Sequence, residues 1–202
     1  MDSKDSDSLG RTTLASTARE GLKIVIIGGF GVGKTTMVQA VSEIRPLSTE
    51  ETMTRAGEGI DDPANAPGKS TTTVAFDFGR ISLTSERVLY LFGAPGQERF
   101  WFLWDRLFRG SLGAVVLVDP RRLDDSFYAI DRLEAGGTPF IVARNCFGEQ
   151  QHSLGDVRGA LQLSEHVPLV DCDARNRSSG KDVLIALVEH LFALHTAREA
   201  VS

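Results

Sequence analysis

Apolar and polar residues alternate in blocks along this chain. Apolar runs of strand length occupy residues 22–28, 72–83, 87–93, 113–119, 138–144 and 167–172. Helix-like spacing, with apolar residues three and four positions apart, marks residues 34–44, 98–109, 121–134, 155–163 and 180–197. Strands that alternate with helices in this way predict an α/β fold.

The connections predict how the strands pair. A short polar turn, Thr84 to Glu86, joins the second and third apolar runs and predicts a hairpin. The other runs are separated by helices, which is typical of parallel strands covered on both faces. We therefore expect a mostly parallel six-stranded sheet with one antiparallel hairpin strand and helices on both faces.

The segments between and outside these elements set the domain limits. Residues 1–20 are rich in Ser, Thr and Asp and predict a flexible tail, residues 21–197 a single domain, and residues 198–202 a C-terminal tail. Residues 46–71 contain three of the seven prolines and few apolar residues. We expect one long loop there, which is either functional or a tolerated surface insertion.

Composition narrows the class of protein. The 202 residues are 42% hydrophobic, enough for one full core. The net charge is −5 and no basic run is longer than two residues, which argues against a nucleic-acid partner. Two cysteines suit a reducing compartment. The apolar runs are far shorter than the roughly 20 residues of a membrane span. We expect a cytoplasmic protein without direct membrane insertion, associated with membranes only through partners.

Residues 28–36 read GGFGVGKTT between an apolar run and a helix-like run. Gly28, Gly33, Lys34 and Thr35 satisfy the pattern G-x-x-x-x-G-K-[ST]. Such glycines turn backbone N–H groups inward, and the following helix adds its positive end, so that the loop cradles phosphate. The lysine can bridge the terminal phosphates and the threonine hydroxyl can bind Mg²⁺. This motif predicts binding of a nucleoside triphosphate.

A second motif, FGAPGQ, closes the third apolar run at residues 92–97. Gly96 can offer its N–H group to a γ-phosphate, and Gln97 can orient an attacking water.

The order of these motifs resembles that of the small Ras-like GTPases. Within that superfamily the chain looks like the bacterial MglA-type GTPases and, more closely, the conservon-encoded GTP-binding proteins of actinobacteria. The stretches LYLFGAPGQERFWFLWD, GAVVLVDPRRL and DARNRSSGKDVLIALVEHL are among those that carry the resemblance, which covers nearly all of residues 22–194. It implies a P-loop small GTPase (G domain) fold and a GTP-binding, slowly hydrolysing molecular switch in bacterial signalling, with GTP/GDP and Mg²⁺ as cofactors.

The resemblance also assigns site residues, with switch I at about residues 46–73 and switch II at about residues 93–109. It gives Gln97 and Lys34 catalytic roles and makes Thr35 and Thr73 the metal ligands, although Thr72 is an alternative and these threonines could be plain strand formers. The implied nucleotide-binding residues are Gly28, Gly29, Gly31, Val32, Gly33, Lys34, Thr35, Thr36, Thr73, Gly96, Asn145, Cys146, Asp173 and Ala174.

The chain departs from the superfamily pattern in two places. Gly93 stands where Ras-like proteins carry an aspartate that holds Mg²⁺ through water. Asp77 either compensates near the metal or is a solvated strand residue. In the guanine-reading motif N-K-x-D, cysteine and glycine replace the lysine and the aspartate, at Cys146 and Gly148. The loss of that carboxylate costs about 1–3 kcal/mol of base discrimination, unless Glu149 supplies another.

Two other functions stay open. The run 113–119 ends in Asp119, as a Walker B strand does in ATPases, which would make this an ATP-binding protein. The two glycine replacements also leave open a pseudo-GTPase scaffold that binds nucleotide weakly or without hydrolysis.

Residues 98–108, ERFWFLWDRLF, predict a partner surface. Phe100, Trp104, Leu107 and Phe108 share a helical face that could be core, whereas Phe102 and its neighbour Trp101 do not fit that face and suggest a docking surface. The resemblance implies a roadblock-type regulatory protein at the switch regions and a possible sensor-kinase-like complex. The chain shows no obvious arginine finger, so we expect the partner to accelerate hydrolysis.

Overall fold

The computed structural model of this protein describes residues 20–45, 47–54, 71–148 and 152–200. Side chains are described for all of these except residues 47–54, 71–75, 98, 99 and 105. The predicted N-terminal tail, apart from its last residue, lies outside the described residues, as does Glu149.

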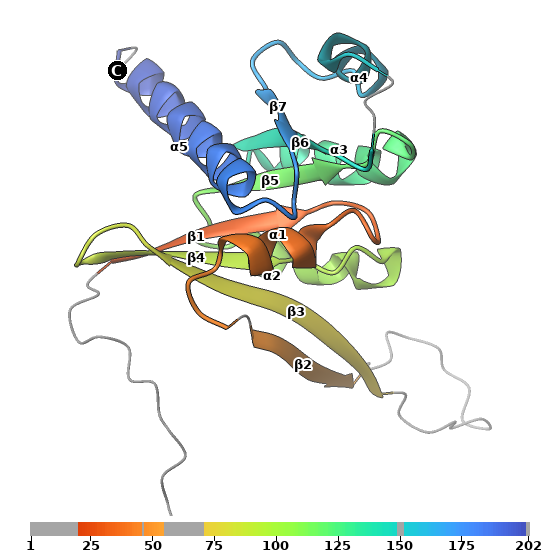
Figure 1. The fold of residues 1–202 in the computed structure, drawn as a ribbon, viewed down its shortest axis with the longest axis vertical. Helices are drawn as coiled ribbons and strands as arrows, with labels where there is room; N and C mark the ends of the chain where they lie inside the picture. Colours follow the sequence, from red (N-terminus) through yellow and green to blue (C-terminus); the bar gives the residue numbers. More distant parts are fainter. Residues whose placement is uncertain (1–19, 46, 55–70, 149–151, 201–202) are drawn as a thin grey trace, which may run out of the picture.

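A seven-stranded sheet, in the order β2-β3-β4-β1-β5-β6-β7, forms the centre of the molecule (Figure 1). Strand β3 is antiparallel to β2 and β4, and the other neighbours are parallel. The predicted fold class is confirmed, with all six predicted strands and the hairpin present. The strands are β1 (Glu20–Ile27), β2 (Leu47–Thr54), β3 (Thr71–Ser82), β4 (Arg87–Gly93), β5 (Gly113–Val118), β6 (Phe140–Asn145) and β7 (Leu169–Cys172).

The seventh strand, β2, corrects one prediction. Residues 47–54 were expected to belong to a long loop, but they pair antiparallel with the first part of β3. An edge strand has a partner on one side only, so it needs no continuous apolar run, and its threonines favour extended backbone. The loop prediction is therefore wrong for these eight residues, while residues 46 and 55–70 lie outside the described part of the chain.

Helices cover both faces of the sheet, as predicted. Helices α1 and α5 lie on one face, and α2, α3 and α4 pack on the other. The predicted helices at 98–109 and 121–134 each begin as a 3-10 turn before becoming α-helical. The helical elements are α1 (Lys34–Val41), η1 (Glu98–Leu103), α2 (Trp104–Phe108), η2 (Leu123–Ser126), α3 (Phe127–Gly136), α4 (Leu154–Ala160) and α5 (Arg177–Glu199).

Strand β1 contributes to both halves of the core. Ile24 and Ile26 pack with α1 and α5, whereas Val25 and Ile27 pack with α2 and α3. Successive side chains of a strand point to opposite faces, so a central strand covered on both faces is apolar throughout. This burial fixes the carboxyl end of β1, from which the GGFGVGKTT loop emerges.

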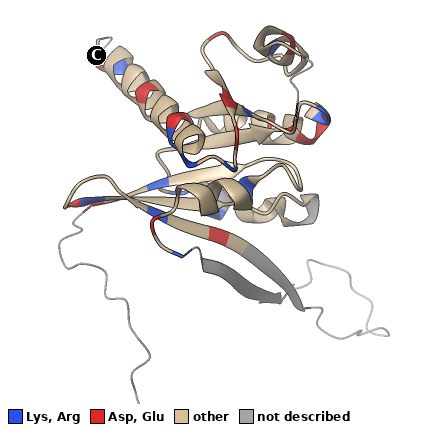
Figure 2. Ribbon diagram, in the orientation of Figure 1, with Lys and Arg blue, Asp and Glu red and all other residues tan. Residues whose placement is uncertain are grey.

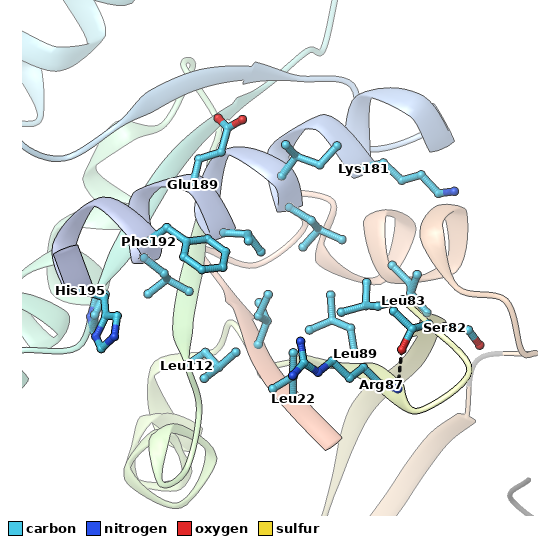
Figure 3. Close-up of a pocket in the computed structure, with 18 of the residues that line it drawn as sticks. Leu22, Ser82, Leu83, Arg87, Leu89, Leu112, Lys181, Glu189, Phe192 and His195 are labelled. Atoms are coloured by element: carbon cyan, nitrogen blue, oxygen red, sulfur yellow. Dashed lines mark hydrogen bonds between the residues drawn. The ribbon is translucent and has the colours of Figure 1, made fainter. Parts of the chain in front are cut away.

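Charged residues of both signs are interspersed over the elements in the view of Figure 2. An apolar groove of about 1000 Å³ lies between α5 and the amino-terminal part of β1, with Leu22, Leu89 and Leu112 facing Phe192 of α5 (Figure 3). This groove is at the opposite end of β1 from the phosphate-loop motif. Among the described helices, none combines the length and apolar character that a bilayer span requires.

Candidate functional site

Three glycines shape the loop between β1 and α1. Gly28, Gly31 and Gly33 have φ angles of 141°, 75° and 105°, in the positive region that residues other than glycine rarely adopt. A Cβ atom on Gly28 would lie 2.2 Å from the backbone oxygen of Leu117, so this backbone also passes too close to β5 for a side chain. The sequence motif thus forms a tight loop that leads directly into the amino terminus of α1.

Lys34, the first residue of α1, points back into this loop. Its Nζ donates hydrogen bonds to the backbone oxygens of Gly28, at 2.8 Å, and Gly29, at 2.6 Å. The side chain is buried, and burial lowers the pKa of Lys34 from 10.5 to about 8, while the negative charge of Asp77 opposes the shift. The lysine amino group is therefore held inside the loop, and its role toward the terminal phosphates of a nucleotide stays a prediction.

Thr35 and Asp77 form the predicted metal side of the site. The Thr35 Oγ1 atom donates a hydrogen bond of 2.5 Å to the Asp77 Oδ2 atom. Asp77 lies opposite Gly93 in the β3–β4 pair, and a Cβ on Gly93 would come within 3.1 Å of the same carboxylate oxygen. A hydroxyl and a carboxylate oxygen side by side fit Mg²⁺, which prefers oxygen ligands. This geometry favours the metal-side interpretation of Asp77 over a solvated strand residue.

The other predicted metal ligand is only partly described. Thr73 lies in β3 opposite Thr52. The side chains of Thr72 and Thr73 are outside the described residues, so the assignment of Thr73 as a ligand stays a prediction.

The second motif packs directly on the phosphate loop. A Cβ on Gly96 would lie 2.5 Å from the Lys34 Nζ atom and 2.7 Å from the backbone oxygen of Gly29. The indole Nε1 of Trp104 donates a hydrogen bond of 3.1 Å to the Pro95 oxygen, which anchors the loop to α2. Gln97 follows Gly96 and occupies the N-cap position of η1, without a capping hydrogen bond from its side chain. Both sequence motifs therefore meet at Lys34.

Asn145 connects the phosphate loop to the loop after β7. Its Nδ2 donates to the Val32 oxygen at 2.8 Å, and its Oδ1 accepts from the Ala174 N–H group at 3.0 Å. The Cys146 thiol donates to the Gly148 oxygen, and the carboxylate of Asp173 accepts hydrogen bonds from its neighbour Arg175. The predicted base-binding residues are thus brought together, but the Asp173 side chain is held by an arginine.

Asp119, the candidate Walker B residue, is engaged elsewhere. It is buried, and its two carboxylate oxygens accept hydrogen bonds from Arg121 at 2.9 and 2.7 Å. The Arg121 guanidinium holds the pKa of Asp119 below its usual value. Both carboxylate oxygens are therefore engaged in the ion pair with Arg121, and the Walker B role of Asp119 stays a prediction.

Sequence reasoning missed Arg122 and Asp125 as neighbours of the phosphate loop. The Arg122 Nη2 atom donates to the Phe30 oxygen at 2.9 Å, and its Nη1 lies 3.5 Å from the Asp125 carboxylate. A Cβ on Gly29 would meet the Asp125 side chain at 2.7 Å. The available signal was their position directly after the carboxyl end of a parallel strand, where ligand sites of such sheets lie.

The aromatic segment at η1 and α2 is mostly packed. Phe100 and Trp104 are buried, as their spacing predicted, and Trp101 stacks on Tyr128 of α3 with ring centroids 3.6 Å apart. Phe102, by contrast, is 56% exposed. The predicted docking surface therefore reduces to the outward face around Phe102.

Comparisons with known proteins agree with this architecture. The G domain of the T. maritima FeoB iron transporter is similar, with a TM-score of 0.58 and 18% identity over 85% of this chain and 99% of that one. The FeoB G domain of Methanococcus jannaschii has a TM-score of 0.53 and 14% identity over 85% and 98%. At these identities the likeness shows the G-domain fold.

A sequence relative and a family complete the comparison. The uncharacterized protein MJ1339 of Methanocaldococcus jannaschii is 29% identical over 101 residues, which are 50% of this chain and 53% of that protein. The chain thus spans about half the length of this curated relative. The family described as "Conserved hypothetical ATP binding protein" matches residues 26–194. With its phosphate loop and G-domain fold, the chain belongs to this family of P-loop nucleotide-binding proteins.

Proposed function

We propose that this protein is a GTP-binding and slowly hydrolysing molecular switch in bacterial signalling, regulated by a partner protein. The observation that carries the proposal is the contact between the second motif and the phosphate loop, where Gly96 lies against the Lys34 ammonium group. A loop in this position meets the terminal phosphate directly, so its conformation depends on whether that phosphate is present.

The residues at the site match the requirements of phosphoryl transfer, which is mostly positioning and charge stabilisation. Lys34 and the loop N–H groups would neutralise the phosphates, and Gln97 would orient the attacking water. Thr35 and Asp77 would hold Mg²⁺. Mg²⁺ held there would supply positive charge that offsets the negative charge of the terminal phosphates.

We infer a low intrinsic rate of hydrolysis. The Arg122 guanidinium donates a hydrogen bond to the Phe30 oxygen and lies near the carboxylates of Asp119 and Asp125. Because these carboxylates largely neutralise its charge, we do not assign Arg122 the role of an arginine finger. Arg99, two positions after Gln97 in the sequence, is another arginine near the second motif, but its side chain lies outside the described residues. An arginine supplied by a partner would raise the rate by about 10³-fold or more.

A hydrolysis assay with a glutamine variant tests the proposal. The nucleotide that co-purifies is first identified, and GTP turnover is then measured with and without a roadblock-type partner. We expect Gln97→Leu to abolish turnover while the affinity for GTP changes little. The matched control is Gln39→Leu, because Gln39 is an exposed residue of α1. GTP binding without any turnover, with or without the partner, would instead support the pseudo-GTPase scaffold.

The exposed ring of Phe102 supports a partner site at switch II. We expect Phe102→Ser to weaken binding of the roadblock-type protein and to leave nucleotide affinity unchanged, whereas Phe192→Ser on α5 should change neither. The sensor-kinase-like complex, cytoplasmic location and partner-mediated membrane association belong to the same proposal.

ATP is the second candidate nucleotide, because the family description names ATP. Direct competition between GTP and ATP for the purified protein measures the preference.

A further inference from the structure

The loops after β5, β6 and β7 are where the base of a bound nucleotide belongs. In the sheet, β3 and β4 lie on one side of β1 and carry the metal-side carboxylate and the second motif, while β5, β6 and β7 lie on the other. Ligands of parallel α/β sheets lie across the carboxyl ends of the strands. A triphosphate on the β1 loop therefore extends its nucleoside toward β6 and β7, to which the loop is tied through Asn145.

The carboxylates that follow β5 and β7 are not free to read a base. Asp119 accepts hydrogen bonds from Arg121 with both oxygens, and Asp173 does the same with Arg175 at 2.8 and 3.0 Å. The N1–H and 2-amino groups of guanine are donors that a free carboxylate would recognise, whereas adenine has an acceptor at N1. A carboxylate already bonded to an arginine contributes little to that distinction.

The loop after β6 is built around a glycine. Gly148 has a φ angle of 138°, which L side chains rarely adopt, and the Cys146 thiol donates to its backbone oxygen. A carboxylate at residue 148 would be strained in this conformation, even though a Cβ there would meet no atom within 4 Å. The backbone conformation at residue 148 therefore disfavours an acidic residue there, so restoring the acid would also require the loop to change its conformation.

Two groups that can stack on a nucleobase, Arg121 and Phe147, lie in the loops after β5 and β6. The Arg121 guanidinium carbon lies 4.1 Å from the centroid of the Phe147 ring, and the Nε and Nη2 atoms of the guanidinium donate hydrogen bonds to Asp119. Phe147 is 37% exposed. A guanidinium plane and an aromatic ring both stack on nucleobases and tolerate any base, because every base has a π face.

We propose that the base site stacks its purine on the Arg121–Phe147 pair and does not read the purine hydrogen-bonding edge. The protein would then bind GTP, ITP and ATP with affinities within about tenfold of one another. This inference rests on the proposed function, since it concerns the same nucleotide site, and it makes GTP one of several purine triphosphates that the isolated protein accepts.

Competition binding tests this directly. GTP, ITP, ATP and inorganic triphosphate are titrated against a fluorescent ribose-labelled GTP on the full chain with Mg²⁺. We expect ITP to equal GTP within about threefold, because loss of the 2-amino group removes no contact, and ATP to follow within about tenfold. A preference of about a hundredfold or more for GTP over both would overturn the inference while leaving the proposed function intact.

Two variants sharpen the test. Phe147→Ala should weaken the binding of all three purine nucleotides by one common factor, about five- to hundredfold, and leave the binding of inorganic triphosphate unchanged. Phe192→Ala, at another exposed phenylalanine, is the matched control. A loss confined to GTP would contradict stacking. A guanine preference that Glu149→Ala removes would show that the purine edge is read and would overturn the inference. If no nucleotide and no inorganic triphosphate binds at all, the proposed function fails, and the base proposal with it.

Discussion

Asp77 shows how one side chain can occupy a position that the Ras-like sequence pattern gives to another strand. Gly93 has no side chain, and the space in front of it contains the carboxylate of Asp77 from β3. The hydrogen bond from Thr35 places that carboxylate beside the hydroxyl expected to bind Mg²⁺. The negative charge that the Ras-like pattern would place at residue 93 of β4 is here supplied by β3, its antiparallel neighbour.

We expect Asp77→Ala to weaken the Mg²⁺-dependent binding of nucleotide. Groups next to a metal-binding ligand typically contribute about 10- to 100-fold in metal affinity, so the Mg²⁺ concentration needed for half-maximal binding should rise by about that factor. The measurement is a Mg²⁺ titration at fixed GTP. Asp131→Ala, an exposed position on α3, is the control, and an unchanged titration for Asp77→Ala would rule out a metal-side role.

Lys34 makes stability depend on pH. Its pKa is about 8 in the folded protein against 10.5 for a free lysine, because burial disfavours the charge. Between these values the unfolded chain binds more protons than the folded one, so stability rises with pH. Relative to Lys34→Met, the free energy of unfolding of the nucleotide-free protein should rise by about 1.4 kcal/mol per pH unit in this window.

Urea unfolding of both proteins at roughly pH 7.5 and pH 9.5 measures this difference. Other titrating groups change in parallel in the two proteins and cancel. A stability difference between the two proteins that stays constant or falls as the pH rises would contradict the lowered pKa of Lys34.

At the scale of elements, the hydrophobic pattern was sufficient to predict six strands of the sheet but not the edge strand β2. The buried strand β5 reads GAVVLV and could hardly be misassigned. Strand β2 reads LSTEETMT, and only its pairing with β3 shows that it is a strand. Its pairing with β3, the next strand along the chain, stabilises it, and the pattern within residues 47–54 does not carry that information.

Helix α5 depends on its cap at the amino terminus. The Asn176 side chain accepts hydrogen bonds from the backbone N–H groups of Ser178 and Ser179. Asn176→Ala should lower the free energy of unfolding by about 1 kcal/mol, whereas Asn176→Ser keeps a capping oxygen and should lower it by a few tenths at most. Denaturant unfolding of both variants tests this, and equal losses would show that the cap contributes nothing.

At the scale of the whole molecule, the phosphate loop could be predicted from the sequence, but the long-range contacts that surround it could not. The pattern G-x-x-x-x-G-K-[ST] is local, so the loop could be predicted from contiguous residues. The approach of Asp77 to Thr35 depends on the β3–β4 register, and the contact of Arg122 with Phe30 joins residues 92 positions apart. Such contacts follow from the assembled sheet, which a single sequence does not specify.

Nucleotide binding should stabilise the whole domain. A ligand at about 100 times its Kd adds about 2.7 kcal/mol, which corresponds to a Tm increase of about 5–10 °C for a domain of this size. We expect this shift with Mg²⁺ and a non-hydrolysable GTP analogue, and a clearly smaller one after chelation of Mg²⁺. Thermal scans measure it, with Lys34→Ala as the control that should show none.

The two hydrogen bonds of Asn145 have a kinetic consequence. They join the phosphate loop and the loop after β7 into one rigid support, on the β5–β7 side of the site. The second motif and the metal-side carboxylate lie on the opposite side of β1, on β3 and β4. For the function proposed here, changes on the β5–β7 side should alter how long a nucleotide stays bound. Changes on the β3–β4 side should alter how fast its terminal phosphate is hydrolysed.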